Sequence, residues 1–398
     1  MDKPQTRILP HPCQPDGDAL AHSERLRTHI NRVLKEEGGW LSFFRFMELC
    51  LYAPGLGYYS AGAAKFGPAG DFVTAPEMTP VFARTLARPV ADTLNHLRTS
   101  GKPSAVLELG AGSGQLARDL LQALERYQAL PDHYWILEVS PDLRERQQAT
   151  LSTLPETLRS RMKWLDTWPE SWTGVLVANE VLDAMPVHKV GWRGEGGWVE
   201  WGIEEQDASW QLTERPLADD RLRERLPEVV GWLAPYDTEV NLIGQDLMVT
   251  LAQTMEFGRA FFIDYGFPAR EYYHPQRSMG TIMCHFRHQA HTDPLLYPGL
   301  QDITAHVDFT AMGKAALEQG LAILGYDSQA RWLLNTGILG ELENTSWPTE
   351  RERFSALSAI HKLLAPQEMG ELFKVLVVGK GLSDPGACLA LGCPFPPG

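Results

Sequence analysis

Apolar runs of strand length alternate along the chain with segments in which apolar residues recur at helical spacing. The run at 106–109 is followed by Leu116, Leu120 and Leu121, which fall on one helical face. This alternation of strand and helix patterns predicts an α/β fold built on a sheet. Further strands are expected at 134–140, 162–168, 174–180, 260–266 and 372–380.

Several stretches depart from this alternation and suggest additions to the α/β domain. Three short runs separated by turns over 187–214 predict an inserted antiparallel meander. Helical periodicity starts after Ser23, a typical N-cap residue, and the aromatic, glycine-rich segment 40–90 is expected to form a lid. The expected organisation is a flexible tail at 1–22, a helical lid region at 23–100, an α/β domain at 101–381 with insertions at about 187–214 and 281–350, and a tail at 382–398.

A glycine-rich turn follows the first expected strand and indicates a nucleotide pocket. Gly110, Gly112 and Gly114 provide backbone angles that other residues avoid, and a ligand can approach their main chain closely. Their spacing is GxGxG, whereas a dinucleotide fingerprint has a third glycine where Gln115 stands. The Lys-Ser/Thr pair of a P-loop is also missing. The turn therefore suits a ligand other than a pyrophosphate.

Acidic residues stand at the ends of the first three expected strands. Glu108 is unfavourable beside phosphates but suits a ligand with an ammonium group and a sulfonium, and S-adenosylmethionine carries both. Glu138 can accept hydrogen bonds from both ribose hydroxyls, and Asp166 is expected near the adenine. Taken alone, GxGxG could be a loop of any α/β protein. Together with the three acids it predicts an S-adenosylmethionine site.

Composition narrows the class of partner. The 398-residue chain has a net charge of −14, which opposes a general nucleic-acid binder and suits a cationic substrate. Its five cysteines are scattered without CxxC pairs, so neither a disulfide framework nor a zinc ribbon is indicated. There is no apolar run of membrane-spanning length and no signal-peptide core. We therefore expect a cytoplasmic protein, or one of the mitochondrial matrix in a eukaryote.

Five segments, taken in order, resemble the MidA-like methyltransferases, a family that includes a member with protein arginine methyltransferase activity. They are "GDFVTAPEMTPVFA", "LELGAGSGQLARDLL", "ANEVLDAMPVHKV", "FIDYG" and "QDITAHVDF", and the resemblance covers about residues 23–381. It implies a Rossmann-like, seven-stranded methyltransferase fold with S-adenosylmethionine as methyl donor. It also implies an arginine side chain of a partner protein as acceptor, with a respiratory NADH dehydrogenase subunit as the expected partner.

Methylation of a guanidinium requires carboxylates that orient the attacking nitrogen and hold the positive charge. Glu180 and Asp183 follow the fourth expected strand, and a helical turn there would place both on one side. Strand ends of open α/β sheets face the ligand crevice, so both acids are expected beside the methyl group, with Asn179 on the amino-acid end of the cofactor. Alternatively, Asp183 caps a helix and Glu180 is solvated.

Five further residues are candidates for contacts around the acceptor and the lid. Thr74 and Glu77 lie with Asp71 on a glycine-flanked loop that could fold over the ligand or simply begin a helix. His306 could contact the incoming arginine or pack a loop, and Asp264 could contact substrate, although a structural hydrogen bond is the commoner role.

No metal site is expected. His285, His288 and His291 occur at intervals of three, but such spacing in strand and loop does not bring them together on one ion, and no acid or cysteine set completes a site.

Two other functions stay open at this point. One is a methyltransferase that acts on a small molecule or a nucleic-acid base. The base would favour an Asn-Pro-Pro-aromatic turn after strand four and a basic channel, and the sequence has neither. The other is a non-catalytic assembly factor that keeps the fold only to bind a partner, but the glycine turn and the acids are intact.

Overall fold

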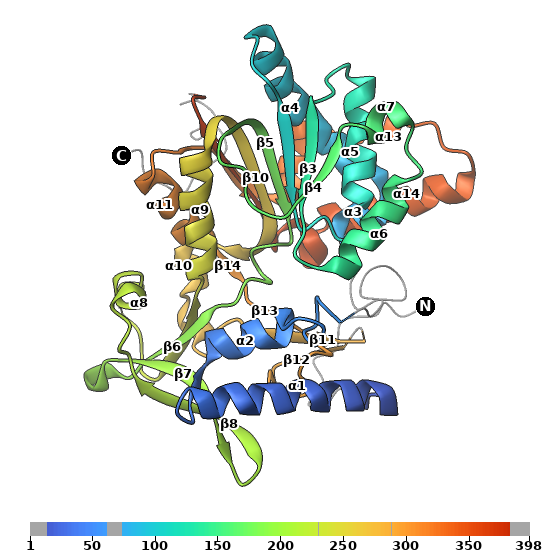
Figure 1. Ribbon diagram of the computed structural model, residues 1–398. Coiled ribbons are helices and arrows are strands. Elements are labelled where there is room, and N and C mark those ends of the chain that lie inside the picture. The colour runs from blue at the N-terminus through green and yellow to red at the C-terminus, as the bar shows by residue number, and fades with distance from the viewer. Residues whose placement is uncertain (1–13, 62–73, 230, 288, 383–398) are drawn as a thin grey trace.

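A mixed sheet forms the centre of the molecule (Figure 1). The computed structural model describes residues 14–61, 74–229, 231–287 and 289–382. Within them the main sheet has the strand order β15-β16-β10-β5-β2-β3-β4, and the short β14 pairs with β10. The strands from β10 to β4 are parallel, whereas β16 is antiparallel to both neighbours. Their bounds are β2 Ala105–Leu109, β3 His133–Leu137, β4 Met162–Leu165, β5 Trp172–Asn179, β10 Met255–Phe267, β14 Val307–Asp308, β15 Ala322–Ser328 and β16 Phe373–Lys380.

Helices cover both faces of this sheet, as an α/β fold requires. One face carries α4 (Pro80–Thr99), α5 (Gln115–Arg126) and α14 (Glu350–Leu364), and the other carries α9 (Leu242–Thr254) and α11 (Phe309–Glu318). The remaining helices of this region are α3 Ala75–Met78, α6 Pro141–Leu151, α7 Glu156–Arg159, α10 Ala269–Tyr272, α12 Gln329–Thr336 and α13 Ile338–Glu343. None of the helices in the described residues is long and apolar enough to cross a membrane.

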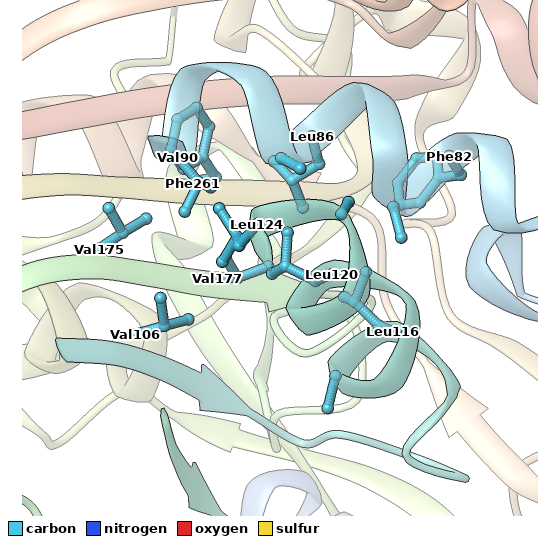
Figure 2. Close-up of a cluster of buried hydrophobic side chains, with 14 of the residues drawn as sticks. Phe82, Leu86, Val90, Val106, Leu116, Leu120, Leu124, Val175, Val177 and Phe261 are labelled. Carbon is cyan, nitrogen blue, oxygen red and sulfur yellow. The ribbon is translucent and has the colours of Figure 1, made fainter. Parts of the chain in front are cut away.

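Helix α4 belongs to the α/β core, which corrects the domain boundary expected at residue 100. Figure 2 shows Phe82, Leu86 and Val90 of α4 above the sheet residues Val175 and Phe261. Their spacing of four places them on one face of the helix, and all are buried. The helical pattern of α4 is visible in the sequence, but the helix overlaps the segment 40–90 that the sequence predicts as a lid.

A second group of elements lies together beyond one end of the strands of the main sheet, below it in the view of Figure 1. The expected meander is present as β6 (His188–Trp192), β7 (Trp198–Gln206) and β8 (Ser209–Pro216). The same sheet also contains β9 (Tyr236–Val240) and β1 (Leu41–Ser42), so the insertion extends beyond 214. The short helix α8 (Asp220–Glu224) lies between β8 and β9.

The helices α1 (Gly17–Glu36) and α2 (Phe43–Tyr52) pack against these strands. Helix α1 begins six residues before Ser23, because Asp16 is its N-cap and accepts a hydrogen bond from the Ala19 N–H at 3.0 Å. Ser23 is buried inside the helix and donates to the Pro298 carbonyl at 3.0 Å. The boundary expected at residue 22 is therefore wrong, because Leu20 in the first turns of α1 is 45% exposed and does not continue the buried face of Leu26 and Ile30.

The insertion expected at 281–350 is much shorter. A small antiparallel sheet contains β11 (Met283–Phe286), β12 (Gln289–His291) and β13 (Asp302–Thr304). After it the chain returns to the main sheet through β14, α11 and β15. The interrupted apolar pattern of β15 did not indicate a strand in the sequence.

Candidate functional site

A cavity of about 940 Å³ lies at the carboxyl ends of β2, β3, β5 and β10. This volume is at the upper end of the range for small-molecule sites, roughly 300 to 1,000 Å³. Elements outside the main sheet close it from the opposite side, including α2, β11 and β13. The cavity is lined by ten of the residues nominated from the sequence: Thr74, Glu77, Glu108, Gly110, Gly112, Glu138, Asn179, Glu180, Asp183 and His306. Gly114 and Asp166 are not among the lining residues.

The glycine turn has the left-handed backbone that its sequence predicts. The φ angles are 57° at Gly110, 53° at Gly112 and 83° at Gly114. A side chain at Gly114 would come within 3.1 Å of the Gln147 Cα, so this glycine allows the turn to pack against α6. The Gln147 side chain donates to the Gly112 carbonyl at 3.1 Å and fixes the turn. Gly110 and Gly112 thus present main chain to the cavity.

Glu138 follows β3 and is held in place by two donors. The Ser140 backbone N–H and the Gln147 amide each donate to its carboxylate at 2.9 Å. Burial raises the pKa of Glu138, and these donors oppose the shift. Its carboxylate therefore has a fixed orientation at the cavity wall.

The other two strand-end acids differ from each other. Glu108 is buried and accepts a hydrogen bond from the Tyr134 hydroxyl, and burial raises its pKa to about 7. Asp166 is 83% exposed and forms an ion pair with Arg144 at 2.8 Å. Trp168, two residues further on, lines the cavity. The contact between Asp166 and adenine stays a prediction that the cavity lining does not support.

Two carboxylates stand side by side after β5. Glu180 has a left-handed φ of 54°, which is uncommon for a residue with a side chain. Asn179 donates to its Oε1 at 3.1 Å. Burial, followed by the charge of Asp183, raises the pKa of Glu180 to about 8, and burial raises that of Asp183 to about 6. The Oδ1 atom of Asp183 is buried without a hydrogen-bond partner among the described residues.

Asp264 of β10, one residue beyond the part of the strand that pairs with β5, holds the loop that carries these acids. Its Oδ2 accepts from the backbone N–H groups of Val181, Leu182 and Asp183 at 3.1, 2.9 and 3.2 Å. Burial and the neighbouring carboxylates raise its pKa well above the ordinary value. Because these N–H groups point at Asp264, the segment forms a turn and not the expected helical turn. Asp264 thus has the structural role that was the commoner alternative.

Thr74 and Glu77 belong to the start of α3. Thr74 is its N-cap residue without a side-chain cap bond, and Glu77 accepts a hydrogen bond from the Ser113 hydroxyl in the glycine turn. The two residues therefore begin a helix, and because both also line the cavity, their contact with a ligand stays a prediction. Asp71 lies outside the described residues.

His306 lines the cavity as a neutral imidazole. Its ring stacks on Phe267 at 5.4 Å and meets the edge of Tyr265 at 5.2 Å between centroids. Burial lowers its pKa to about 4, and its Nδ1 has no hydrogen-bond partner in the described part of the chain. His285 also lines the cavity, and His288 lies outside the described residues. Within those residues, no group of three or more His, Cys, Asp or Glu side chains could hold a metal ion.

The sequence did not indicate several lining residues. Tyr52 and Tyr59 lie in or near the aromatic segment assigned to the lid, and Asp302 lies four residues before His306. These three residues differ from other aromatic and acidic residues of the sequence only in that they lie at the cavity. Contacts between segments so distant along the chain leave no local pattern.

The fold and the site together define an S-adenosylmethionine-dependent methyltransferase. The glycine turn offers main chain, Glu138 offers an oriented carboxylate, and Asn179 has a buried Oδ1 without a partner among the described residues. These groups fit the amino-acid end and the ribose of that cofactor. A family model described as "Putative S-adenosyl-L-methionine-dependent methyltransferase" matches residues 85–327, and the chain belongs to this family.

Individual relatives agree with this assignment. A COG1565 superfamily member from Burkholderia thailandensis, crystallised with S-adenosyl-homocysteine, is 46% identical with a TM-score of 0.87, over 94% of this chain and 96% of that one. The Drosophila melanogaster protein arginine methyltransferase NDUFAF7 homolog, mitochondrial, is 29% identical over 94% of this chain and 90% of its own. Human protein arginine methyltransferase NDUFAF7, mitochondrial, is 27% identical over 87% and 81%.

Proposed function

We propose that this methyltransferase transfers the methyl group to an arginine side chain of a partner protein. The observation that carries the proposal is the pair Glu180 and Asp183, two acids on one turn that face the cavity. No Lys or Arg of the described residues is among the groups that shift the pKa of Glu180 or Asp183. A buried carboxylate without a cation is costly, and an incoming guanidinium would offset that cost.

The cofactor residues follow from the cavity wall. Glu138 would hold the ribose hydroxyls, the main chain at Gly110 and Gly112 would face the amino-acid end, and Asn179 would contact that end. When bound, S-adenosylmethionine supplies an electrophilic methyl group on its sulfonium. Glu108, deeper in the site, adds negative potential that suits the charges of this cofactor.

The acids act on the acceptor. A guanidinium stays protonated in proteins and its nitrogens are poor nucleophiles, so it must be oriented with its charge held on the nitrogens that do not react. Its arrival would favour the ionised form of Glu180, because an opposite charge lowers a raised carboxyl pKa. Asp264 keeps both acids in place by holding the turn between them. His306 would contact the acceptor through the neutral ring.

The protein partner is inferred from relatives and charge. Relatives that match over most of this chain are named protein arginine methyltransferases. The net charge of −14 would attract a basic segment. We infer that the acceptor arginine lies on a subunit of respiratory NADH dehydrogenase.

Replacement of Glu180 by Gln tests the catalytic role. The variant keeps the shape of the side chain and loses its charge, so we expect S-adenosylmethionine affinity close to wild type and a transfer rate at least about tenfold lower, or roughly 1.4 kcal/mol in the barrier. The measurement is incorporation of labelled methyl into protein in extract from cells that lack the chain. Glu318→Gln, at the exposed end of α11, is the matched control. A wild-type rate in Glu180→Gln would remove Glu180 from the mechanism.

A further inference from the structure

One wall of the cavity comes from elements outside the main sheet. We call Tyr52 of α2, Tyr59 after it and Asp302 of β13 the aromatic wall, and all three line the cavity together with Asp183. They come from other elements than the cofactor residues, and the two parts of the site adjoin, because the Ser140 hydroxyl donates to the Tyr59 carbonyl while the Ser140 N–H donates to Glu138.

Both tyrosines are fixed by their hydroxyl groups. Tyr52 donates to the Ala184 carbonyl at 2.8 Å, next to Asp183, and Tyr59 donates to the two carboxylate oxygens of Asp302 at 3.1 and 3.0 Å. The two rings stack with centroids 5.5 Å apart and planes inclined by 21°. Because the hydroxyls are already used, what Tyr52 and Tyr59 present to a ligand is ring surface.

The charge at the aromatic wall is negative. Asp302 and Asp183 are buried, with 3% and 6% of their surface exposed. After burial itself, both acids raise the pKa of Tyr52, in line with a negative field at its ring. Asp183 contributes the Oδ1 atom that lacks a partner among the described residues. Ring faces beside carboxylates attract cations.

We propose that the aromatic wall, with Asp183, is the acceptor pocket and selects a planar guanidinium over an ammonium group. A guanidinium can stack on a ring and donate in parallel to a carboxylate, whereas an ammonium is a strongly hydrated point charge. This inference rests on the proposed function and adds the residues that recognise the acceptor. It also explains why arginine, and not lysine, is the side chain that the site takes.

Binding of small cations tests the pocket without any need for methyl transfer. Ethylguanidinium and ethylammonium are titrated into protein with saturating S-adenosylhomocysteine and followed by ligand-observed NMR. We expect wild type to bind ethylguanidinium at least about fivefold more tightly than ethylammonium, roughly 1 kcal/mol. Asp302→Asn and Tyr52→Ala should each weaken the binding of ethylguanidinium by a similar factor.

Two matched variants separate this role from a general loss of structure. Tyr52→Phe keeps the ring but loses the hydrogen bond to the Ala184 carbonyl, so it should weaken the binding of ethylguanidinium less than Tyr52→Ala does, and binding by Glu318→Gln should be unchanged. Affinity for S-adenosylhomocysteine should stay within about twofold in every variant, which shows an intact fold. Equal binding of the two cations by wild type, or wild-type ethylguanidinium binding in both Asp302→Asn and Tyr52→Ala, would overturn the inference. Absence of methyl on protein arginine, with this preference intact, would instead overturn the proposed function.

Discussion

Glu180 combines a left-handed backbone, a partly buried position and a neighbouring carboxylate after β5. Each of these features costs stability. Asp264 supports the arrangement through three backbone N–H groups of the following turn. At the scale of single residues, the turn after β5 thus holds two acids whose pKa values are raised, and a cationic acceptor would favour their ionised form.

The raised pKa of Glu180 leads to a pH-dependent stability difference. The folded carboxyl has a pKa of about 8 and its ordinary value is 4.5, so the folded state retains a proton that the unfolded chain has lost. Folding is therefore progressively less favourable as the pH rises from about 5 to 8, and the cost is constant above that range. Gln at position 180 has no such proton.

We expect the melting temperature of Glu180→Gln minus that of wild type to increase between pH 5 and 8. Each kcal/mol corresponds to about 2 to 4 °C for a domain of this kind. Thermal melts at several pH values provide the measurement, with Glu318→Gln as the surface control. A Glu180→Gln difference that does not change with pH would contradict the assigned burial.

At the scale of elements, the glycine turn between β2 and α5 can be compared with the glycine turn that precedes β2. Gly112 has a φ of 53° and faces the cavity, whereas Gly101 has a φ of 66° in a turn before β2 and lines no part of it. A Cβ at either position meets no atom within 4 Å. The two glycines therefore differ in their relation to the cavity but not in backbone strain.

Gly112→Ala and Gly101→Ala should lose similar stability, about 1 to 2 kcal/mol each for the left-handed conformation. Only Gly112→Ala is expected to weaken the binding of S-adenosylmethionine, because the methyl group of the new alanine would extend toward the cofactor. Urea denaturation and calorimetry measure the two effects. Equal affinities for the cofactor in both variants would show that the turn does not hold it.

The elements that local patterns encode were predictable. The alternation of apolar runs located β2, β3, β4, β5, β10 and β16, and the turn spacing located the three strands of the meander. Glu180 and Asp183 were indicated because strand ends are where α/β sheets bind ligands. By contrast, β9 pairs with β6 across the whole meander, and β15 joins the sheet beside β16, and such long-range pairings leave no local pattern.

The same limit applies to the site. Asp302 approaches Tyr59 across a sequence separation of 243 residues, and no spacing in the sequence relates them. Asp166 shows the limit from the other side, since its place at a strand end predicts a contact with adenine, whereas its side chain is 83% exposed and does not line the cavity, so that contact stays a prediction. Position along a strand indicates that a residue can reach the crevice, but neighbouring elements decide whether it does.

At the scale of the whole molecule, the cavity separates two packed regions. The main sheet has its own buried clusters, and α1 and α2 form another with the strands of the smaller sheets. A ligand between them contacts both, and it should therefore stabilise the molecule as a unit.

The negative net charge gives the surface a general attraction for basic partners.

S-adenosylhomocysteine at 100 times its dissociation constant should stabilise the protein by about 2.7 kcal/mol, because it binds the folded state only. The shift in melting temperature with ligand concentration measures this effect. NAD at the same concentration should give no shift, since the turn lacks the dinucleotide spacing. A shift with NAD and none with S-adenosylhomocysteine would contradict the cofactor site.

The most direct test of arginine methylation compares methylated peptides from cells that lack this chain with peptides from cells that express it. Mass spectrometry of their proteins should find methyl-arginine lost from a specific partner, restored by the wild-type chain and not by Glu180→Gln. The same methyl-arginine level in all three strains, or labelled methyl that reaches only a small metabolite or RNA, would contradict the account.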